Sequence, residues 1–180
     1  MRGHLASLLL AACVLAACDA PKDAKPVGAA EVALPRQAEP LPDEVAKTVN
    51  LLKQTAAQGS YRDLARLANI TPDFRSNNGG MSHAEYWDLK QRTGDFPAIQ
   101  IEKVLTYPHA VADSAQGRVF IWPYMAMLKP EEITPAAARE IDRLLGEGQA
   151  RELRNGAVWP GYVLGIREDG LWLYFVSGSG

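Results

Sequence analysis

Cysteine and histidine are scarce in this sequence, and the common catalytic motifs are missing. Only two of the 180 residues are cysteine and three are histidine. After residue 18, a zinc site would have to combine His83 or His109 with carboxylates from separate elements, whereas zinc normally needs at least three convergent protein ligands. There is no His-Glu-x-x-His motif, Gly-x-Ser-x-Gly elbow, glycine-rich phosphate loop or EF-hand. We therefore expect no metal site and no cofactor.

An excess of positive charge is also lacking. Lys and Arg number 19 against 21 Asp and Glu, which gives a formal net charge of −2. Nucleic-acid binding needs Lys and Arg clustered on one face of the protein. We therefore expect no nucleic-acid partner.

The sequence has no apolar run long enough to cross a bilayer as a helix. The longest N-terminal run extends from Leu5 to Leu15 and follows a short, weakly basic start with Arg2 and His4. A basic start, a short apolar run and small residues before a cleavage point are typical of a signal peptide. The run ends in Leu15-Ala16-Ala17-Cys18.

The motif Leu15-Ala16-Ala17-Cys18 resembles the lipobox of bacterial lipoproteins. The resemblance implies that residues 1–17 are removed and that Cys18 then carries a diacylglyceryl thioether and an amide-linked acyl chain. About two to three acyl chains hold a protein on a membrane far more firmly than one. Acylation would leave no free thiol, which excludes disulfides, thiol catalysis and cysteine-ligated metals in the mature monomer. The alternative is an ordinary secretory signal that happens to contain Cys13 and Cys18.

Asp19 follows the lipobox. In lipoproteins of enteric-type bacteria, an aspartate at this place is similar to the signal that retains the protein in the inner membrane. The resemblance thus implies attachment to the cell membrane through the lipid on Cys18, on the periplasmic side. It slightly favours the inner over the outer membrane.

The rest of the chain divides into a tether and a domain. Residues 18–43 contain the lipidated cysteine and five prolines among Ala, Lys, Asp and Glu, which predicts a disordered, proline-rich tether. Residues 44–180 carry all four Trp and all six Tyr and are numerous enough for a single globular domain.

Four helices are expected between residues 43 and 105. Each start carries an N-cap, a capping box or a proline at the first helical position. In chain order these signals are Asp43, Ser60 with Asp63, Ser82 with Glu85, and Pro97. The first helix has apolar residues three and four positions apart and ends at Gly59. In the last segment a strand is the alternative, because Ile99 and Ile101 alternate with polar or small neighbours.

Strand signals follow. Residues 117–123 are β-branched and aromatic, and residues 162–167 and 171–176 flank a turn at Asp169-Gly170 that gives the strongest hairpin signal in the chain. Between them, Thr134-Pro135 opens a helix that either stops near Gly148 or continues to Leu153. This order predicts an α+β fold, with N-terminal helices packed on a small antiparallel sheet that ends in a C-terminal β-hairpin.

Aromatic residues beside prolines form the most suggestive candidate binding set. Trp122, Tyr124, Trp159 and Tyr162 flank Pro123 and Pro160. Rigid aromatic side chains give a large contact area at low entropic cost, as a platform for a sugar, peptide or protein surface would need. The alternative is that they fill a small core, which the sequence favours.

The loop around Arg75 is a second candidate. Residues 75–80 offer an arginine and backbone amides that could bind an anion or carboxylate in the manner of a nest. An ordinary surface turn explains its glycines equally well and is favoured.

Glu85 and Asp88 share a helical face and form the only candidate acid–base pair. Catalysis on glycosides uses two carboxylates, one of which needs its pKa raised by burial. With Tyr124 or Tyr162 lining a pocket, the pair would suit a small-ligand site or hydrolase. The favoured alternative is that Glu85 completes a capping box at a helix start.

Two resemblances concern the domain. The run 159–166, followed by 169–175 and a glycine, is similar to the C-terminal signature of uncharacterised envelope proteins from proteobacteria, which implies no known activity. The early helices with residues 58–64 are similar to the opening of small-ligand folds of the NTF2-like type.

These observations favour a membrane-anchored envelope lipoprotein with a non-catalytic periplasmic interaction domain of unknown ligand. An envelope protein or the cell wall is the expected partner, besides the membrane itself. The small-ligand pocket or hydrolase is the alternative.

Overall fold

The computed structural model describes residues 40–114 and 117–178. The signal peptide, Cys18, Asp19 and nearly all of the expected tether lie outside the described residues. The expectations for that part of the chain stay predictions.

Four helices occupy the first half of the described chain. They are α1 (Asp43–Ala57), α2 (Tyr61–Ala68), α3 (His83–Arg92) and α4 (Pro97–Val104). The Ser60 side chain accepts a hydrogen bond from the Asp63 amide, and Ser82 forms a complete capping box with Glu85, as predicted. The predicted cap at Asp43 is wrong, because Asp43 is itself the first helical residue and the helix start has no side-chain cap. A carboxylate in the first turn still interacts favourably with the helix dipole.

One antiparallel sheet follows, with its strands in the order β1-β2-β3-β4. They are β1 (Ala110–Ser114), β2 (Gly117–Trp122), β3 (Tyr162–Arg167) and β4 (Trp172–Ser177). The β3–β4 hairpin and its pairing with β2 are confirmed, and Trp122 lies opposite Leu164. The α+β fold class predicted from the order of the elements is therefore correct.

Strand β1 was not predicted. Ala110 and Ala112 have low β-propensity, so the segment carries little strand signal of its own. It becomes a strand because it pairs antiparallel with β2, with Val111 opposite Phe120.

Two 3-10 turns and two helices lie between β2 and β3. They are η1 (Tyr124–Met127), η2 (Pro130–Glu132), α5 (Pro135–Leu145) and α6 (Gln149–Arg154). The predicted helix at Thr134-Pro135 is confirmed, but it does not continue through Gly148. Gly146 and Gly148 both have positive φ, and the Asp142 side chain accepts a hydrogen bond from the Ala150 amide at 2.8 Å, so a separate helix begins there.

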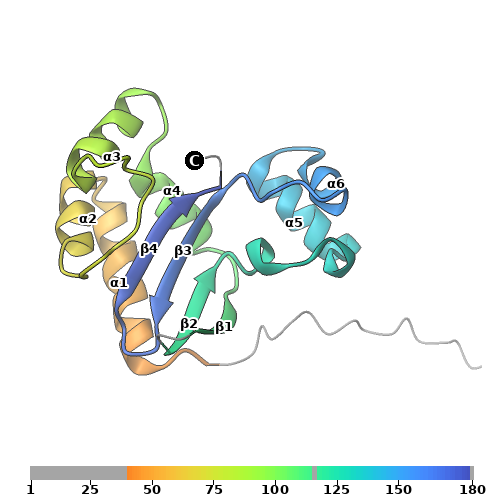
Figure 1. The fold of residues 1–180 in the computed structure, drawn as a ribbon, viewed down its shortest axis with the longest axis horizontal. Helices are drawn as coiled ribbons and strands as arrows, with labels where there is room; N and C mark the ends of the chain where they lie inside the picture. The colour runs from red at the N-terminus through yellow and green to blue at the C-terminus, as the bar shows by residue number, and fades with distance from the viewer. Residues whose placement is uncertain (1–39, 115–116, 179–180) are drawn as a thin grey trace, which may run out of the picture. The chain divides into compact units, whose positions relative to one another are not determined.

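Helices α1 to α4 pack on one face of the sheet (Figure 1). Alternate residues of β2 and β3 point into this layer, as the period of two requires. In β4 the two core residues, Trp172 and Phe175, are three positions apart, because the pairing of β4 with β3 is irregular beside Gly165 and Ile166. The sheet contributes Phe120, Trp122, Leu164, Ile166, Trp172 and Phe175 to this core. The helices contribute Val45, Leu52, Leu64, Trp87 and Ile101 among others.

A second, smaller core forms around α5 and α6. Ile141 and Leu144 of α5 and Leu153 of α6 pack with Tyr124 and Met125 of η1. This cluster lies beyond the end of the strands, where β2 runs into η1 (Figure 1).

Candidate functional site

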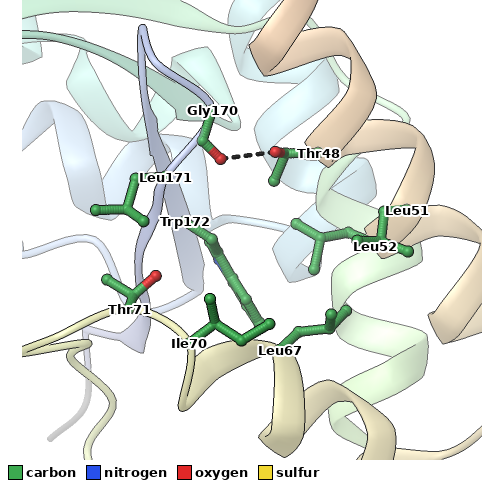
Figure 2. A pocket seen from close by; sticks show the side chains of 9 residues that line it. All are labelled: Thr48, Leu51, Leu52, Leu67, Ile70, Thr71, Gly170, Leu171 and Trp172. Atoms are coloured by element: carbon green, nitrogen blue, oxygen red, sulfur yellow. Dashed lines mark hydrogen bonds between the residues drawn. The ribbon is translucent and has the colours of Figure 1, made fainter.

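An apolar cleft lies where α1, the end of α2 and the β3–β4 turn meet (Figure 2). Its volume is about 150 Å³. The cleft is lined by Thr48, Leu51, Leu52, Leu67, Ile70, Thr71, Gly170, Leu171 and Trp172. These residues come from three segments that are far apart in the sequence.

The β3–β4 turn is held against α1 by one short hydrogen bond. The Thr48 hydroxyl donates to the Gly170 carbonyl at 2.6 Å, as the dashed line in Figure 2 shows. Gly170 has φ +85°, a conformation that only glycine adopts without strain. The turn that made the hairpin predictable therefore also forms one side of the cleft.

Apolar side chains line the cleft, and two of them are unusually exposed. Trp172 is 4% exposed and closes the inner side, whereas Leu51 and Ile70 at the mouth are 46% and 70% exposed. Thr71 is 6% exposed, and its hydroxyl is turned toward Trp172 in Figure 2. With no charged residue in its lining, the cleft can hold an uncharged apolar group and offers one hydroxyl beside it.

The sequence did not single out this cleft. One feature of the sequence could have indicated the cleft. Leu51 is apolar but lies off the apolar stripe of α1, which runs through Val45, Val49 and Leu52. Ile70 similarly follows the end of α2, where nothing in the local pattern buries it. Each is an ordinary exposed residue alone, and only the tertiary structure brings them together.

Three members of the predicted aromatic set are buried. Trp122, Tyr124 and Trp159 are 3%, 1% and 9% exposed. Trp122 belongs to the core under α1–α4, and Tyr124 and Trp159 belong to the core around α5 and α6. Their ring faces are not presented to a partner as an exposed platform. The structure thus agrees with the alternative that they fill the core.

Tyr162, the fourth member, is half-buried and bonded to Asp95. Its hydroxyl donates to the Asp95 carboxylate at 2.6 Å, and its ring stacks on Phe175 with 4.6 Å between centroids. Burial, and then the bond to Asp95, raise the pKa of Tyr162. Lys90 contacts the same carboxylate at 2.6 Å. This network ties the α3–α4 connection to β3.

The Asp95 carboxylate makes the stability of the fold depend on pH. Burial opposes its ionisation, but bonds from Lys90 and Tyr162 outweigh burial, and the pKa of Asp95 is lowered. Its contribution to stability is therefore full above the unfolded-state pKa of about 3.9 and is lost as the pH falls through the lower folded-state pKa.

We expect Asp95→Asn to be less stable than the wild type at pH 7 and to lose less stability between about pH 4 and pH 2. The free energy of unfolding in urea, measured at several pH values, checks this. Glu102→Gln, at an exposed carboxylate of α4, is the control. Equal acid sensitivity of Asp95→Asn and the wild type would contradict the assigned role of Asp95.

The carboxylates of Glu85 and Asp88 serve local structure. Glu85 accepts hydrogen bonds from Ser82, which lower its pKa. Asp88 accepts a hydrogen bond from the Tyr61 hydroxyl at 2.6 Å, and this bond lowers the pKa of Asp88. A general acid needs a raised pKa, so neither group is prepared for that role. Both border a shallow groove between α2 and α3, away from Tyr124 and Tyr162.

Arg75 extends the sheet. Its amide donates to the Leu173 carbonyl at 3.1 Å, and its carbonyl accepts from the Phe175 amide at 3.0 Å, so the segment pairs with the outer edge of β4. Asn77 continues this pairing through two side-chain bonds to the backbone of Ser177. The Arg75 amide is thus not free to join an anion nest, but its guanidinium is exposed and lies 5.1 Å from the centre of the Tyr174 ring.

Within residues 40–114 and 117–178, no three His, Cys, Asp or Glu side chains are grouped so as to hold a metal ion. No helix in this part of the chain is both long and apolar enough to cross a membrane. No protein-family model matches the sequence, and no curated protein or solved structure shows significant similarity to it.

Proposed function

We propose that this chain is a lipid-anchored protein of the bacterial cell envelope, with a domain that binds a ligand or partner without catalysing a reaction. The motif Leu15-Ala16-Ala17-Cys18 after the apolar run carries the first half of the proposal. The anchor is the acylated Cys18, and Asp19 favours the inner membrane. We expect the domain to lie on the periplasmic side, joined to the anchor by the tether of residues 18–43.

A binding role is supported by the hydrogen bonds of the side chains that could act as an acid or a base. The hydroxyls of Tyr124 and Tyr162 are bonded to Glu140 and Asp95, and the carboxylates of Glu85 and Asp88 are bonded as described. Each candidate for acid–base chemistry is thus engaged in holding the fold together. The apolar cleft, by contrast, exposes Leu51 and Ile70 to solvent. Exposed apolar side chains around a hollow are typical of binding sites.

The anchor is tested by replacing Cys18. We expect Cys18→Ser to move from the membrane fraction to the soluble periplasmic fraction or to be retained with an uncleaved signal, and to incorporate no labelled fatty acid. The wild-type chain should incorporate a fatty-acid analogue fed to the cells and stay with the membranes.

A conservative change elsewhere in the signal run, Cys13→Ser, is the matched control and should behave like the wild type. If Cys18→Ser still incorporated the label, or if the wild type incorporated none, the lipid anchor would be ruled out.

A further inference from the structure

We propose that the apolar cleft binds a small neutral molecule, a compact hydrocarbon group that carries one hydrogen-bond acceptor, such as a ketone, an ester or an alcohol. The proposal rests on the non-catalytic binding function above and names a ligand class for it. It is carried by the size of the cleft, by its uncharged lining and by a buried indole N–H in its wall. The cleft shares no lining residue with the groove that Glu85 and Asp88 border, so this ligand is not a substrate of that pair.

The size of the cleft limits the ligand to one small ring or a short chain. Leucine and isoleucine side chains and the Trp172 ring form most of a wall that encloses about 150 Å³. Apolar cavities of about this size stay dry in other proteins and bind benzene. A longer ligand would have to extend past Leu51 and Ile70, which are exposed at the mouth.

The inner wall is already fixed in place without a ligand. The Trp172 ring contacts Phe74 and Trp87, with 4.6 and 6.1 Å between ring centroids. The hydrogen bond from Thr48 holds the turn at Gly170 against α1. Because these groups are ordered beforehand, binding costs little conformational entropy, and even a small ligand can bind measurably.

The charge around the cleft favours a neutral ligand. The lining contains no charged residue, and three ion pairs lie next to lining residues in the chain. These pairs are Lys47–Glu44 on α1, Arg66–Asp63 on α2 and Arg167–Asp169 at the β3–β4 turn. An ion inside the cleft would lose its hydration without gaining an ionic partner. An uncharged molecule pays no such penalty.

The indole N–H of Trp172 favours a ligand with an acceptor. It is buried and has no hydrogen-bond partner in the part of the chain that the structure describes. Buried donors are normally bonded, and the indole nitrogen can only donate. Trp87 and Trp159 also have unbonded indole nitrogens, but neither lines the cleft. A ketone, ester or alcohol oxygen would accept the bond from Trp172 without bringing a charge.

Cyclohexanone is the probe that tests the site. It is titrated into the ¹⁵N-labelled mature chain, residues 18–180 with Cys18→Ser, so that neither the signal peptide nor an acyl chain competes. We expect saturable binding with a dissociation constant on the order of 1 mM. The indole N–H signal of Trp172 should move downfield as it gains a hydrogen bond, whereas the signal of Trp159 should stay in place.

Three further six-membered rings test the charge and the acceptor. Cyclohexanecarboxylate and cyclohexylammonium should bind at least about tenfold more weakly than cyclohexanone, because each ion loses hydration in the cleft. Benzene should bind about three- to fivefold more weakly and should not move the Trp172 signal downfield, because it has no oxygen to accept the bond.

Exposed positions at the mouth test the location of the site without entering the core. The double variant Leu51→Ser/Ile70→Ser should weaken both cyclohexanone and benzene about three- to tenfold, because it removes apolar surface from the wall. Leu89→Ser/Ile99→Ser is the matched control, at exposed positions of α3 and α4, and should bind both like the wild type. Thermal unfolding of each variant shows that it is folded.

The proposal is overturned if cyclohexanone shows no saturable binding, or if the carboxylate or the ammonium ion binds as tightly as cyclohexanone. A Trp172 signal that stays in place while cyclohexanone binds would also overturn it, as would a Leu51→Ser/Ile70→Ser variant that binds like its control. These results would leave the acylation of Cys18 untouched, so they are distinguishable from failure of the proposed anchor.

Discussion

Replacing Trp87 by alanine should lower the free energy of unfolding by about 3–5 kcal/mol, because it removes the largest side chain that joins α3 to the sheet. Trp87 is 1% exposed. Its ring stacks on Trp172 of β4 with 6.1 Å between centroids and meets Phe74 and Phe175 edge-on, each at 6.3 Å. Alanine would leave a cavity among rings that cannot collapse into it.

Trp87→Phe should cost much less, about 1–2 kcal/mol. The indole nitrogen of Trp87 is buried without a hydrogen-bond partner in the described chain, so phenylalanine loses volume but no hydrogen bond. Leu89→Ala, at a 40% exposed position of the same helix, should change stability by less than about 0.5 kcal/mol. Urea unfolding measures all three. A Trp87→Ala protein as stable as Leu89→Ala would show that α3 is not packed on the sheet.

Gly170→Ala should lower the free energy of unfolding by about 2–4 kcal/mol and the Tm by roughly 5–15 °C. Two effects combine: the positive φ of +85° strains any residue with a Cβ, and that Cβ would lie 2.8 Å from the Glu44 carbonyl oxygen. Because the obstacle is the backbone of α1, the turn has to move away from the helix. The bond between Thr48 and Gly170 would then weaken as well.

Gly94→Ala separates the two effects. Gly94 has φ +86°, and a Cβ there meets nothing within 4 Å, so its substitution reports backbone strain alone, about 1 kcal/mol. Calorimetry of both variants gives the difference. If Gly170→Ala were no less stable than Gly94→Ala, the turn would not be packed against α1, and the cleft would lose one of its sides.

Local signals explain why the helices and the hairpin could be predicted. The Ser82–Glu85 capping box and the Asp169-Gly170 turn each depend on residues that are neighbours in sequence, and both form as predicted. Strand β1 was missed because its stability comes from pairing with β2 and not from its own residues. The sequence left open whether the helix that begins at Pro135 continues past Gly148, because the apolar spacing resumes at Leu153; in the structure this helix ends at Leu145 and α6 is separate.

The candidate site could not be predicted from the sequence because it also depends on contacts between residues that are far apart in the chain. The cleft is made by α1, the end of α2 and a turn more than 100 positions later, and the hydrogen bond between Thr48 and Gly170 joins residues 122 apart. The aromatic residues beside prolines attracted attention because their types suit both cores and interfaces. Whether these residues fill a core or form an interface depends on how deeply they are buried. For Tyr124 and Trp159, burial results from the packing of α5, α6 and η1, which the local sequence does not show.

The mass of the N-terminal peptide of the membrane-purified protein tests the central claim most directly. After proteolysis and extraction into organic solvent, mass spectrometry should find a peptide that starts at Cys18 and carries the added mass of a diacylglyceryl group together with an amide-linked acyl chain. A mature peptide that starts at another residue, or one in which Cys18 is unmodified, would contradict the proposed lipid anchor.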